Sequence, residues 1–386
     1  MTAATGKVDP QYQAHFYDTS TGSTSRVAIC NDFVSIYYKK QVNHAGMAVI
    51  TVPEDHQLVS LLADDFLIEI LVTAPKPEGY AIGGVTGDVV WYIDFVGVYR
   101  DKQVATDGDG NLYYVLYFPG AIDVLSRNII AWAAGTDRRS SWSGVAVATI
   151  AHEIVRYNCT SSATAANGRI RDASVIRTFT SLGAISGTPT VSYAAAGQNV
   201  LETLQELARI GAFDFDVLRL IISGVPNRLA FIEYANQLGT DRSATCFFQI
   251  ELDNLASSNM TAGRLGEKTV AIVGGQGQGS ARTYTVRTGD NYSASNDYEL
   301  FIDARSNTAA ELTTIGDAKM SEMKARLSLD ADVIGSQGYV YRRDYAHGDI
   351  VTVRFAGTTV SKKITAVEVK FSQDQSSNIR VELEDL

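Results

Sequence analysis

The chain is 386 residues long and carries 33 Lys and Arg against 43 Asp and Glu, so its formal net charge is −10 at pH 7. This length exceeds what one ordinary core fills and predicts two or three domains, and an apolar content of 45% excludes a disordered chain. Lys and Arg form no large cluster, which excludes a protein built to grip nucleic-acid phosphates.

The cysteines Cys30, Cys159 and Cys246 lie far apart in the sequence. They predict a reducing compartment during assembly and no disulfide framework. Residues 1–4 show no charged leader before an apolar run, so we expect no signal peptide. No stretch approaches the roughly eighteen uninterrupted apolar residues of a transmembrane helix, so we expect no membrane insertion.

Residues 1–142 are predicted to form an N-terminal β-rich domain. Segments rich in β-branched and aromatic residues alternate there with Gly and Asp clusters, which is typical of strands and turns. The predicted strands are 35–38, 67–72, 89–93 and 113–118. Residues 57–63 are a candidate short helix.

Residues 143–235 are predicted to form a smaller α/β domain. A first helix has apolar residues on one face, namely Val147, Ile150, Ala151, Ile154 and Tyr157. A second helix, capped by Asn199, is expected to bury Leu201, Leu204, Leu207, Ala208 and Gly211. Residues 213–217 are predicted to be a strand, and 160–198 a long connection rich in Ser, Thr, Ala and Gly.

Residues 236–386 are predicted to form a β-domain with one helix at about 308–328. Apolar and polar residues alternate at 281–287, after the glycine-rich stretch, which predicts a strand. Thr308 and Glu311 match a capping box. The helix is expected to place on one face Leu312, Ile315, Met320, Met323 and Leu327. Alternation at 366–371 and 379–384 predicts antiparallel hairpins.

The glycine-rich stretch at 273–282 suggests either a nucleotide site or a β-connection. A dinucleotide fingerprint requires Gly-x-Gly-x-x-Gly between a strand and a helix. Here Gly275, Gly277 and Gly279 are spaced one residue short and a strand follows. A Gly-Lys-Ser/Thr phosphate loop is also absent. We therefore predict a bulged β-connection that uses glycine for positive φ.

Two further patterns resemble metal sites. His152-Glu153 begins like a zinc-protease motif, but Arg156 stands at the second ligand position, so a helix-surface His–Glu pair is favoured. Residues 107–111 alternate oxygen ligands like a calcium loop, but Leu112 replaces its glycine and Phe118 its bidentate Glu. A hairpin turn is favoured there, with an adventitious ion as the alternative.

Other candidate catalytic patterns are incomplete. Ser321 and Lys324 match Ser-x-x-Lys, but no Ser-Asp-Asn or Lys-Thr-Gly accompanies them. Asp64-Asp65 and Asp214/Asp216 are paired carboxylates. A glycosidase needs two carboxylates at a set separation, which the sequence alone does not give. The histidines show no ligand spacing: His15, His44, His56, His152 and His347. We predict no catalytic residue, no cofactor and no metal site.

The 19 tyrosines suit both strands and interfaces. For Tyr339, Tyr341 and Tyr345 the two uses are equal alternatives, whereas strand use is favoured for those at 113–117. Short basic pairs are predicted to be solvated strand edges, namely Lys39-Lys40, Arg138-Arg139, Arg342-Arg343 and Lys362-Lys363.

The order of motifs in the last third resembles one protein family. Gly275 to Arg282 reads Gly-x-Gly-x-Gly-x-x-Arg, a strand then carries Asp303-Ala304-Arg305, and a helix follows. Residues 341–353 read Tyr-x-x-Asp-Tyr-x-x-Gly-Asp-x-Val-x-Val. This order is similar to the siphophage tail-hub family, the Gp37-like tail proteins of long-tailed bacteriophages. The N-terminal part looks similar to it at 31–33, 46–53, 94–98 and 127–132.

The resemblance implies a mixed α+β, predominantly β fold, with two antiparallel β-barrel-like hub domains flanking the α/β middle region. It implies a structural virion protein, a tail-tip or baseplate hub subunit that joins the tail tube to the tip around a central DNA passage. Assembly in the host cytoplasm as a homotrimer is expected. Implied partners are the distal tail protein, the tape-measure protein and a tail fibre or spike, while DNA passes without specific binding.

Two other functions stay open. A receptor- or glycan-binding tail module predicts an exposed aromatic shelf near 339–345. A cell-wall hydrolase needs a catalytic constellation, which the sequence does not contain. We therefore expect a protein that is not an enzyme, in which substitution of Gly348 or Asp349 damages assembly rather than turnover.

Overall fold

The structure is a computed structural model. It describes residues 10–18, 25–75, 89–133, 140–173, 179–222, 225–252, 254–305, 307–333, 339–355, 357–372 and 377–385. Its content is 48% strand and 17% helix, which confirms the predicted predominantly β, mixed α+β class. Arg138 and Arg139, one of the basic pairs, lie outside the described residues. Within those ranges, no helix is both long and apolar enough to span a membrane.

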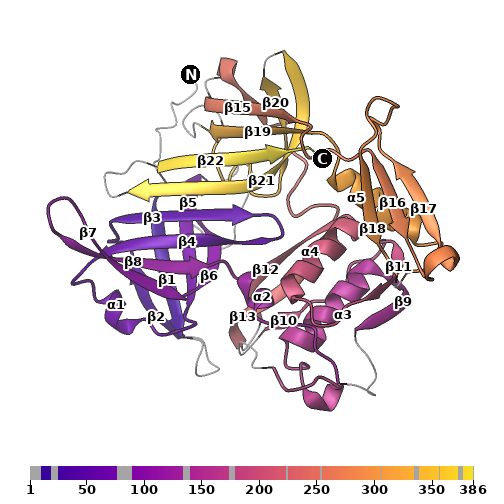
Figure 1. Ribbon diagram of the computed structural model, residues 1–386. Coiled ribbons are helices and arrows are strands. Elements are labelled where there is room, and N and C mark those ends of the chain that lie inside the picture. Colours follow the sequence, from indigo (N-terminus) through magenta and orange to yellow (C-terminus); the bar gives the residue numbers. More distant parts are fainter. Residues whose placement is uncertain are drawn as a thin grey trace.

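One ten-stranded sheet contains strands from both the first and the last third of the chain (Figure 1). Strand β21 (Thr358–Ser372) pairs antiparallel with β3 (Ser35–Gln41), so yellow and indigo strands lie side by side in Figure 1. The path continues on the C-terminal side through β22 (Ser377–Glu384), β19 (Arg326–Val333) and β15 (Leu255–Gly263). It continues on the N-terminal side through β4 (His44–Pro53), β8 (Leu112–Pro119) and β7 (Asp101–Thr106). Two strands branch from β21, namely β20 (Ile350–Phe355) and its parallel partner β14 (Phe247–Gln249).

The strands of this sheet alternate because only one of its faces is buried. In β22, Ile379, Val381 and Leu383 are buried, whereas Asn378 and Arg380 are exposed. This confirms the alternation predicted at 379–384. The strands predicted at 35–38, 67–72, 89–93 and 113–118 are likewise present.

A four-stranded antiparallel sheet packs against the buried face of the large sheet. Its order is β2 (Ser25–Cys30), β1 (Tyr12–Asp18), β5 (Leu67–Pro75) and β6 (Val89–Val98). Residues from both ends of the chain fill one core between the two sheets, including Phe16, Phe118, Phe248 and Tyr345. The short helix predicted at 57–63 is α1 (Leu58–Leu61), and Leu58 reaches this core.

The middle region has its own core, in which α3 (Val147–Cys159) and α4 (Val200–Gly211) pack together. Asn199 caps α4 as predicted, because its Oδ1 accepts hydrogen bonds from the N–H groups of Leu201 at 2.9 Å and Glu202 at 3.4 Å. Leu204, Leu207, Ala208 and Gly211 are buried as predicted, but Leu201 is only half-buried. The helix α2 (Asp123–Ser126) also contacts α4.

A hairpin of two long strands and three shorter strands complete the middle region. The hairpin β12 (Phe213–Ile222) and β13 (Val225–Ala235) contains the strand predicted at 213–217. The connection predicted at 160–198 contains a 3₁₀ turn, Ala165–Asn167, and two strands, β10 (Thr180–Ser181) and β11 (Thr190–Ala194). They pair with β13 and with β9 (Ser141–Ala146), respectively.

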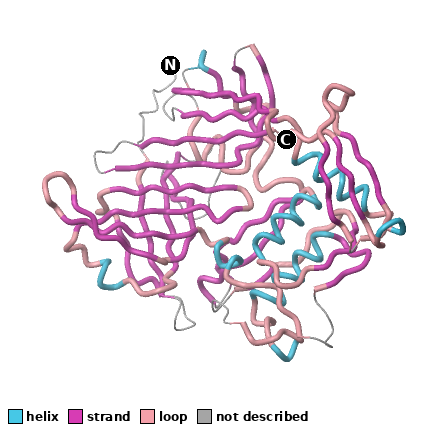
Figure 2. Tube along the Cα trace, viewed as in Figure 1, coloured by secondary structure: helices cyan, strands magenta, loops and turns pink. Residues whose placement is uncertain are grey.

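A small third unit interrupts the C-terminal strands; it is orange in Figure 1, and Figure 2 shows its strands in magenta and its helix in cyan. The central strand β16 (Val270–Gly274) pairs antiparallel with β17 (Tyr284–Thr288) and parallel with β18 (Glu299–Asp303). The helix α5 (Leu312–Glu322) covers one face, where Leu312 and Met320 are buried. The helix is shorter than the predicted 308–328, because Leu327 belongs to β19. The capping box is only half formed: Glu311 Oε2 accepts the Thr308 N–H at 2.7 Å, and the helix begins at Leu312.

The predicted β-barrel-like hub domains do not close within the described ranges. Among the described strands, the order of each sheet ends at edge strands that have only one partner, and the branched ten-stranded sheet has a third such end at β14. The physical reason is that β21 pairs with β3 from the first third, so the strands of each end extend a shared sheet instead of closing on themselves. The domain boundaries at residues 142 and 235 stay a proposal.

Candidate functional site

Three buried carboxylates lie where the first, middle and last regions of the chain meet. Asp94 in β6, Asp214 in β12 and Asp349 before β20 are 2%, 4% and 2% exposed. A buried carboxylate is costly unless charges and hydrogen bonds satisfy it. Each of these carboxylates bonds to groups from another part of the chain. We call the three carboxylates, together with the cations and hydrogen-bond donors that contact them, the carboxylate junction.

Asp94 joins the first region to the segment before β20. Its Oδ2 accepts a hydrogen bond from Tyr38 OH at 2.5 Å, and its Oδ1 accepts one from Tyr341 OH at 2.9 Å. Lys40 Nζ and Arg342 Nε each lie 3.5 Å from Oδ1. Burial alone would raise the pKa of Asp94, but the two cations and two hydroxyl groups outweigh burial and lower the pKa. Asp94 is therefore a buried anion that ties β3 and β6 to the C-terminal region.

Asp214 joins the middle region to both others. Its Oδ2 lies 2.6 Å from Lys363 Nζ in β21 and accepts the Leu238 N–H at 2.7 Å. Its Oδ1 accepts a hydrogen bond from Asn43 Nδ2 at 3.3 Å, at the turn between β3 and β4. Asn43 Oδ1 in turn accepts the Phe215 N–H at 2.7 Å. One side chain thereby contacts β21, the β3–β4 turn and the segment after β13.

Asp349 fixes the segment after β13 to the start of β20. Its Oδ1 accepts the Thr240 N–H at 2.6 Å. Its Oδ2 accepts hydrogen bonds from Arg242 Nε and from the Ala346 N–H, each at 2.8 Å. The Asp of the Gly-Asp motif is thus a structural acceptor for three donors.

The two backbones approach closely beside Asp349. A Cβ on Gly239 would stand 2.3 Å from the Asp349 nitrogen, and a Cβ on Gly348 would stand 2.8 Å from the Gly239 nitrogen. Gly348 also adopts φ +87°, a region that favours glycine. Glycine is therefore required on both sides of this contact.

A cavity of about 400 Å³ opens between these groups, and it is lined by Lys40, Asp94, Asp216, Arg342 and His347, among others. Burial raises the pKa of Asp216 to about 6 although Lys40 opposes it, and burial lowers the pKa of His347 well below its usual value. The arrangement is suited to holding three regions together.

The aromatic shelf expected near 339–345 is not exposed. Tyr341 and Tyr345 are 4% and 0% exposed. The Tyr345 ring packs edge-on against Phe248 with ring centroids 5.1 Å apart. The segment turns inward because Tyr341 bonds to Asp94 and Tyr345 fills the core between the two large sheets. Of the two uses left open for these tyrosines, the structure shows burial in the core for Tyr341 and Tyr345, while Tyr339 is half-buried.

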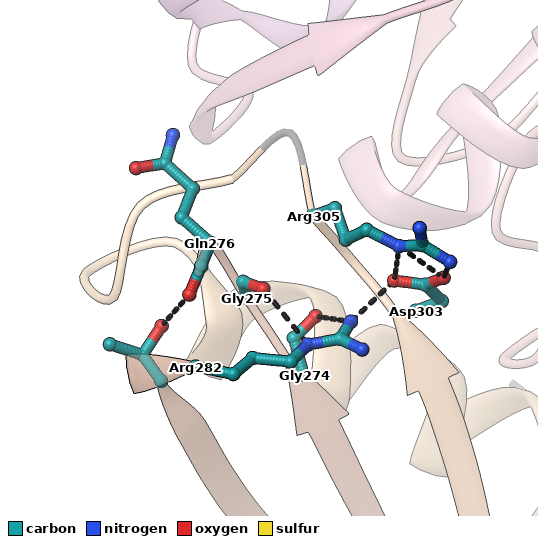
Figure 3. A network of polar contacts seen from close by, with 7 residues as sticks. Gly274, Gly275, Gln276, Arg282, Asp303 and Arg305 are labelled. Atoms are coloured by element: carbon teal, nitrogen blue, oxygen red, sulfur yellow. Dashed lines mark hydrogen bonds and ion pairs between the residues drawn. The ribbon is translucent and has the colours of Figure 1, made fainter. Parts of the chain in front are cut away.

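The glycine-rich stretch forms a cradle for Arg282 (Figure 3). Arg282 Nε donates to the Gly275 carbonyl at 3.1 Å, and Nη2 donates to the Gly274 carbonyl at 2.8 Å and pairs with Asp303. A Cβ on Gly274 would stand 2.8 Å from the guanidinium, so glycine makes room for it. Hydrogen bonds from Arg305 and then Arg282 lower the pKa of Asp303 to about 2. The motif residues Arg282, Asp303 and Arg305 therefore form one ion-paired group.

The predicted β-connection is confirmed. Gly277 and Gly279 adopt φ +104° and +52°, and a Cβ on Gly277 would stand 2.3 Å from the Ala281 carbonyl oxygen. After a 3₁₀ turn, Gly279–Ala281, the chain enters β17 as an antiparallel partner of β16. A dinucleotide fingerprint would place a helix N-terminus at this point.

The loop at 107–111 is the predicted hairpin turn between β7 and β8. Asp107 Oδ1 accepts the N–H groups of Asp109 and Asn111, each at 2.9 Å, and Tyr113 OH donates to Oδ2 at 3.0 Å. The hydrogen bonds from Asn111 lower the pKa of Asp107 to about 2. Both carboxylate oxygens of Asp107 thus already accept hydrogen bonds from the protein itself.

His152 and Glu153 bond to neighbouring strands. His152 Nδ1 lies 2.6 Å from Ser181 Oγ in β10. Glu153 Oε2 accepts a hydrogen bond from Trp142 Nε1 in β9 at 2.6 Å. Both residues lie half-buried on the helix α3, and each bonds to a neighbouring strand.

Of the basic residues predicted to be solvated, Lys362 is buried and several others are partly buried. Lys362 has a 1% exposed side chain, and its Nζ lies 2.5 Å from Asp385 Oδ1. Lys40, Lys363 and Arg342 belong to the carboxylate junction. In β3, strand alternation places Lys40 toward Asp94 and Lys39 toward Glu382 on the other face, and a partly buried cation needs such a carboxylate.

Cys30, Asp32 and His56 form a group of three potential metal ligands among the described residues. His56 Nε2 lies 3.0 Å from Asp32 Oδ1 and 3.8 Å from Cys30 Sγ. The Leu58 N–H donates to His56 Nδ1 at 3.1 Å, which places the ring proton on Nε2, toward Asp32. Burial raises the pKa of Cys30 to about 12, so the thiol stays protonated. These residues fit a hydrogen-bonded cluster better than a metal site.

Sequence reasoning missed these groupings because their members come from separate elements. Cys30 ends β2, while His56 precedes α1. Asp94 did carry a local signal, since it is the only charged residue in the apolar strand β6. A lone charge in a strand of that composition predicts a buried partner.

The outer face of the ten-stranded sheet is polar and carries paired charges. Lys39 Nζ in β3 lies 2.6 Å from Glu382 Oε1 in β22. Lys370 Nζ lies 2.8 Å from Glu368 Oε1 and 5.7 Å from the Tyr37 ring centre. A surface that grips phosphates needs cations without such neighbours. Lys39 and Lys370 on this face are therefore neutralised by neighbouring carboxylates.

Solved structures with a similar fold include a tail protein and two prophage tail proteins. A tail protein from Neisseria meningitidis MC58 has 11% identity and a TM-score of 0.57, over 97% of each chain. The 43 kDa tail protein of prophage MuSo2 from Shewanella oneidensis has 10% identity and a TM-score of 0.55, over 96% of this chain and 97% of that one. Prophage tail protein gp18 from Listeria monocytogenes EGD-e has 12% identity and a TM-score of 0.53, over 97% and 94%. The chain thus has the fold of phage tail proteins.

A protein-family model described as Siphovirus ReqiPepy6 Gp37-like protein matches residues 17–383. The chain belongs to this family, and the resemblance seen in its motifs is confirmed. No curated protein sequence gives a match.

Proposed function

We propose that this protein is a subunit of the tail-tip or baseplate hub of a long-tailed phage, where it joins the tail tube to the tip around a central DNA passage. The observation that carries the proposal is the ten-stranded sheet that combines both ends of the chain and presents a polar outer face. The family and the tail-protein fold support the same role. The working unit would be a homotrimer.

The strand order supports a geometric function. Each subunit contributes two sets of strands to one sheet, joined at β3 and β21. Three subunits would present six such sets, which suits a junction between a six-fold tube and a three-fold tip. The carboxylate junction would hold the sets and the middle region at fixed angles. The outer sheet face, with its paired charges, would let DNA slide without binding it.

The proposed partners are the distal tail protein, the tape-measure protein and a tail fibre or spike. The proposed location is the virion, at the tail tip. We also propose that the protein is not an enzyme, because its buried titratable groups at the junction are engaged in holding regions together. A hydrolase is not favoured by any contact described above.

Negative-stain electron microscopy of the purified protein tests the hub role. We expect rings with a central hole and three-fold or near six-fold symmetry, alone or after the distal tail protein is added. The variant Asp349→Ala should reduce the fraction of rings, whereas Asp109→Ala, on the exposed β7–β8 turn, should leave it unchanged. Particles that stay monomeric with and without the distal tail protein would contradict the proposal.

A further inference from the structure

A polar hollow of about 560 Å³ lies at the end of the three-stranded sheet where β17 ends and β18 begins. This volume falls within the roughly 300–1,000 Å³ range of small-ligand sites. Arg282 and its glycine cradle occupy the opposite end of the same sheet. The hollow is therefore separate from the features that define the family motif.

Glu267 organises the hollow. The residue is 7% exposed, and its Oε1 accepts a hydrogen bond from Asn291 Nδ2 at 2.8 Å. Its Oε2 accepts one from Arg264 Nε at 2.9 Å. These hydrogen bonds, that from Asn291 first, lower the pKa of Glu267, so the carboxylate stays ionised. Asn291 and Arg264 are thereby held in place before a ligand arrives.

Thr269 fixes the loop that precedes β18. It is 2% exposed, and its Oγ1 accepts the Tyr298 N–H at 2.9 Å and donates to the Asn296 carbonyl at 2.7 Å. The Thr269 N–H donates to the Tyr298 carbonyl at 2.9 Å. The backbone of Tyr298 is thus pinned on both sides, yet its side chain leaves the residue 57% exposed. The result is a rigidly mounted aromatic ring at the rim of the hollow.

The charged and polar groups that line the hollow determine which class of ligand it can bind. An anion would meet the Glu267 carboxylate, and a cation would meet Arg264. An apolar ligand would desolvate amide, hydroxyl and guanidinium groups without pairing them. A neutral ligand with several hydroxyl groups can donate to carbonyl oxygens and accept from N–H groups at the same time.

We propose that this hollow binds a neutral sugar. The C–H face of a pyranose ring would lie on the exposed ring of Tyr298, which offers an apolar face with a polar tip. Asn291 and Arg264 would bond its hydroxyl groups, and Glu267 is the positioning residue that orients both. The site is additional to the hub role and does not depend on it. It supplies the exposed aromatic residue that the segment 339–345 lacks.

The test uses the full-length protein on an array of neutral oligosaccharides made of hexoses and N-acetylhexosamines. The saccharide retained best, and its methyl glycoside, are then titrated by isothermal calorimetry. Binding of both assigns a single pyranose as the ligand, and binding of the oligosaccharide alone assigns a longer glycan. Either result supports the proposal.

Matched variants locate the binding. Tyr298→Ala should weaken the affinity at least tenfold, and Tyr298→Phe should retain it because the ring remains. Tyr284→Ala is the control, since Tyr284 is 55% exposed on the same sheet at its other end. Thermal unfolding confirms that each variant is folded. An array with no retained saccharide, or equal losses in Tyr298→Ala and Tyr284→Ala, overturns the proposal, while rings in the microscope would still support the hub.

Discussion

Tyr341 and Asp94 are 247 residues apart in the sequence, yet the Tyr341 hydroxyl donates a hydrogen bond to Asp94 Oδ1 at 2.9 Å. The contact lies beside the pairing of β3 with β21, where the two ends of the chain form one sheet. Asp214 and Asp349 add the middle region and the segment after β13 to the same place. A few buried polar contacts therefore link all three regions of the chain.

Asp94→Ala is expected to lower the free energy of unfolding by about 3–5 kcal/mol, because it leaves Lys40 and Arg342 without their buried carboxylate. Tyr341→Phe should cost about 1–2 kcal/mol. Urea unfolding followed by fluorescence measures both. Tyr37→Phe, on the outer sheet face, is the control and should change stability by less than about 0.5 kcal/mol. A loss below about 1 kcal/mol for Asp94→Ala would contradict this account.

Glu233→Gln should stabilise the protein in alkaline but not in acidic solution. Burial raises the pKa of Glu233 to about 7, and its Oε2 accepts the Ile185 N–H at 3.0 Å. The folded pKa exceeds the unfolded one, so this group stabilises the fold fully below pH of about 4 and loses that contribution as the pH rises through 7. Gln keeps the acceptor and removes the charge. We expect a gain of up to about 3 kcal/mol at pH 8 and almost none at pH 4.

Thermal unfolding of Glu233→Gln and wild type at pH 4, 6 and 8 measures this gain. The exposed Glu251→Gln serves as the control and should show no such trend. A gain of equal size at all three pH values would refute a role for ionisation of Glu233.

Gly348→Ala should be more damaging than Gly110→Ala. Both glycines have similar φ, +87° and +85°, so both substitutions carry the cost of a left-handed residue, about 1–2 kcal/mol. Only at Gly348 would the new Cβ meet backbone, 2.8 Å from the Gly239 nitrogen, whereas nothing lies within 4 Å at Gly110. Chemical denaturation and the fraction of assembled rings measure the difference. Equal losses for the two variants would show that crowding at Gly239 does not matter.

Arg282→Lys should loosen the three-stranded sheet locally. A lysine cannot contact the Gly274 and Gly275 carbonyls and Asp303 together, because its ammonium is a single point of charge. Hydrogen–deuterium exchange should become faster in β16 and β18 and stay unchanged in β3 and β21. Arg287→Lys, whose pair with Asp317 is exposed, is the control.

The variant Gly274→Ala tests the same cradle from the other side. Its Cβ should displace the guanidinium, so the cost of Gly274→Ala should shrink when Arg282→Ala is also present. Strict additivity of the two substitutions, measured by chemical denaturation, would mean that the glycine and the arginine are independent.

Local patterns predicted much of the secondary structure. The cap at Asn199, the strand at 284–288 and the turn at 107–111 follow from side chains within a few residues of one another. The apolar spacing predicts a helix over 308–328, which is too long. Leu327 fits that spacing, but it already belongs to a strand with alternating residues. The spacing of apolar residues is thus a weak guide to where a helix ends and a strand begins.

The candidate site was harder to predict, because it depends on contacts between distant segments. Neither the pairing of β3 with β21 nor the bond between Asp94 and Tyr341 follows from spacing along the chain. The family motif identified Gly348 and Asp349, but their contact with the segment around Gly239 appears only in three dimensions. The hollow around Glu267 combines the residues before β16 with the loop before β18 in the same way.

The pairing of β3 with β21 also sets the order in which the chain can fold. Residues 35–41 leave the ribosome long before residues 358–372 have been synthesised, so the nascent β3 has an open edge and half of its core is missing. Closure of the central sheet must then be a late, long-range event, which is slow because the intervening chain has to be brought together first. During synthesis the nascent chain is therefore exposed to mispairing and is a natural client for chaperones.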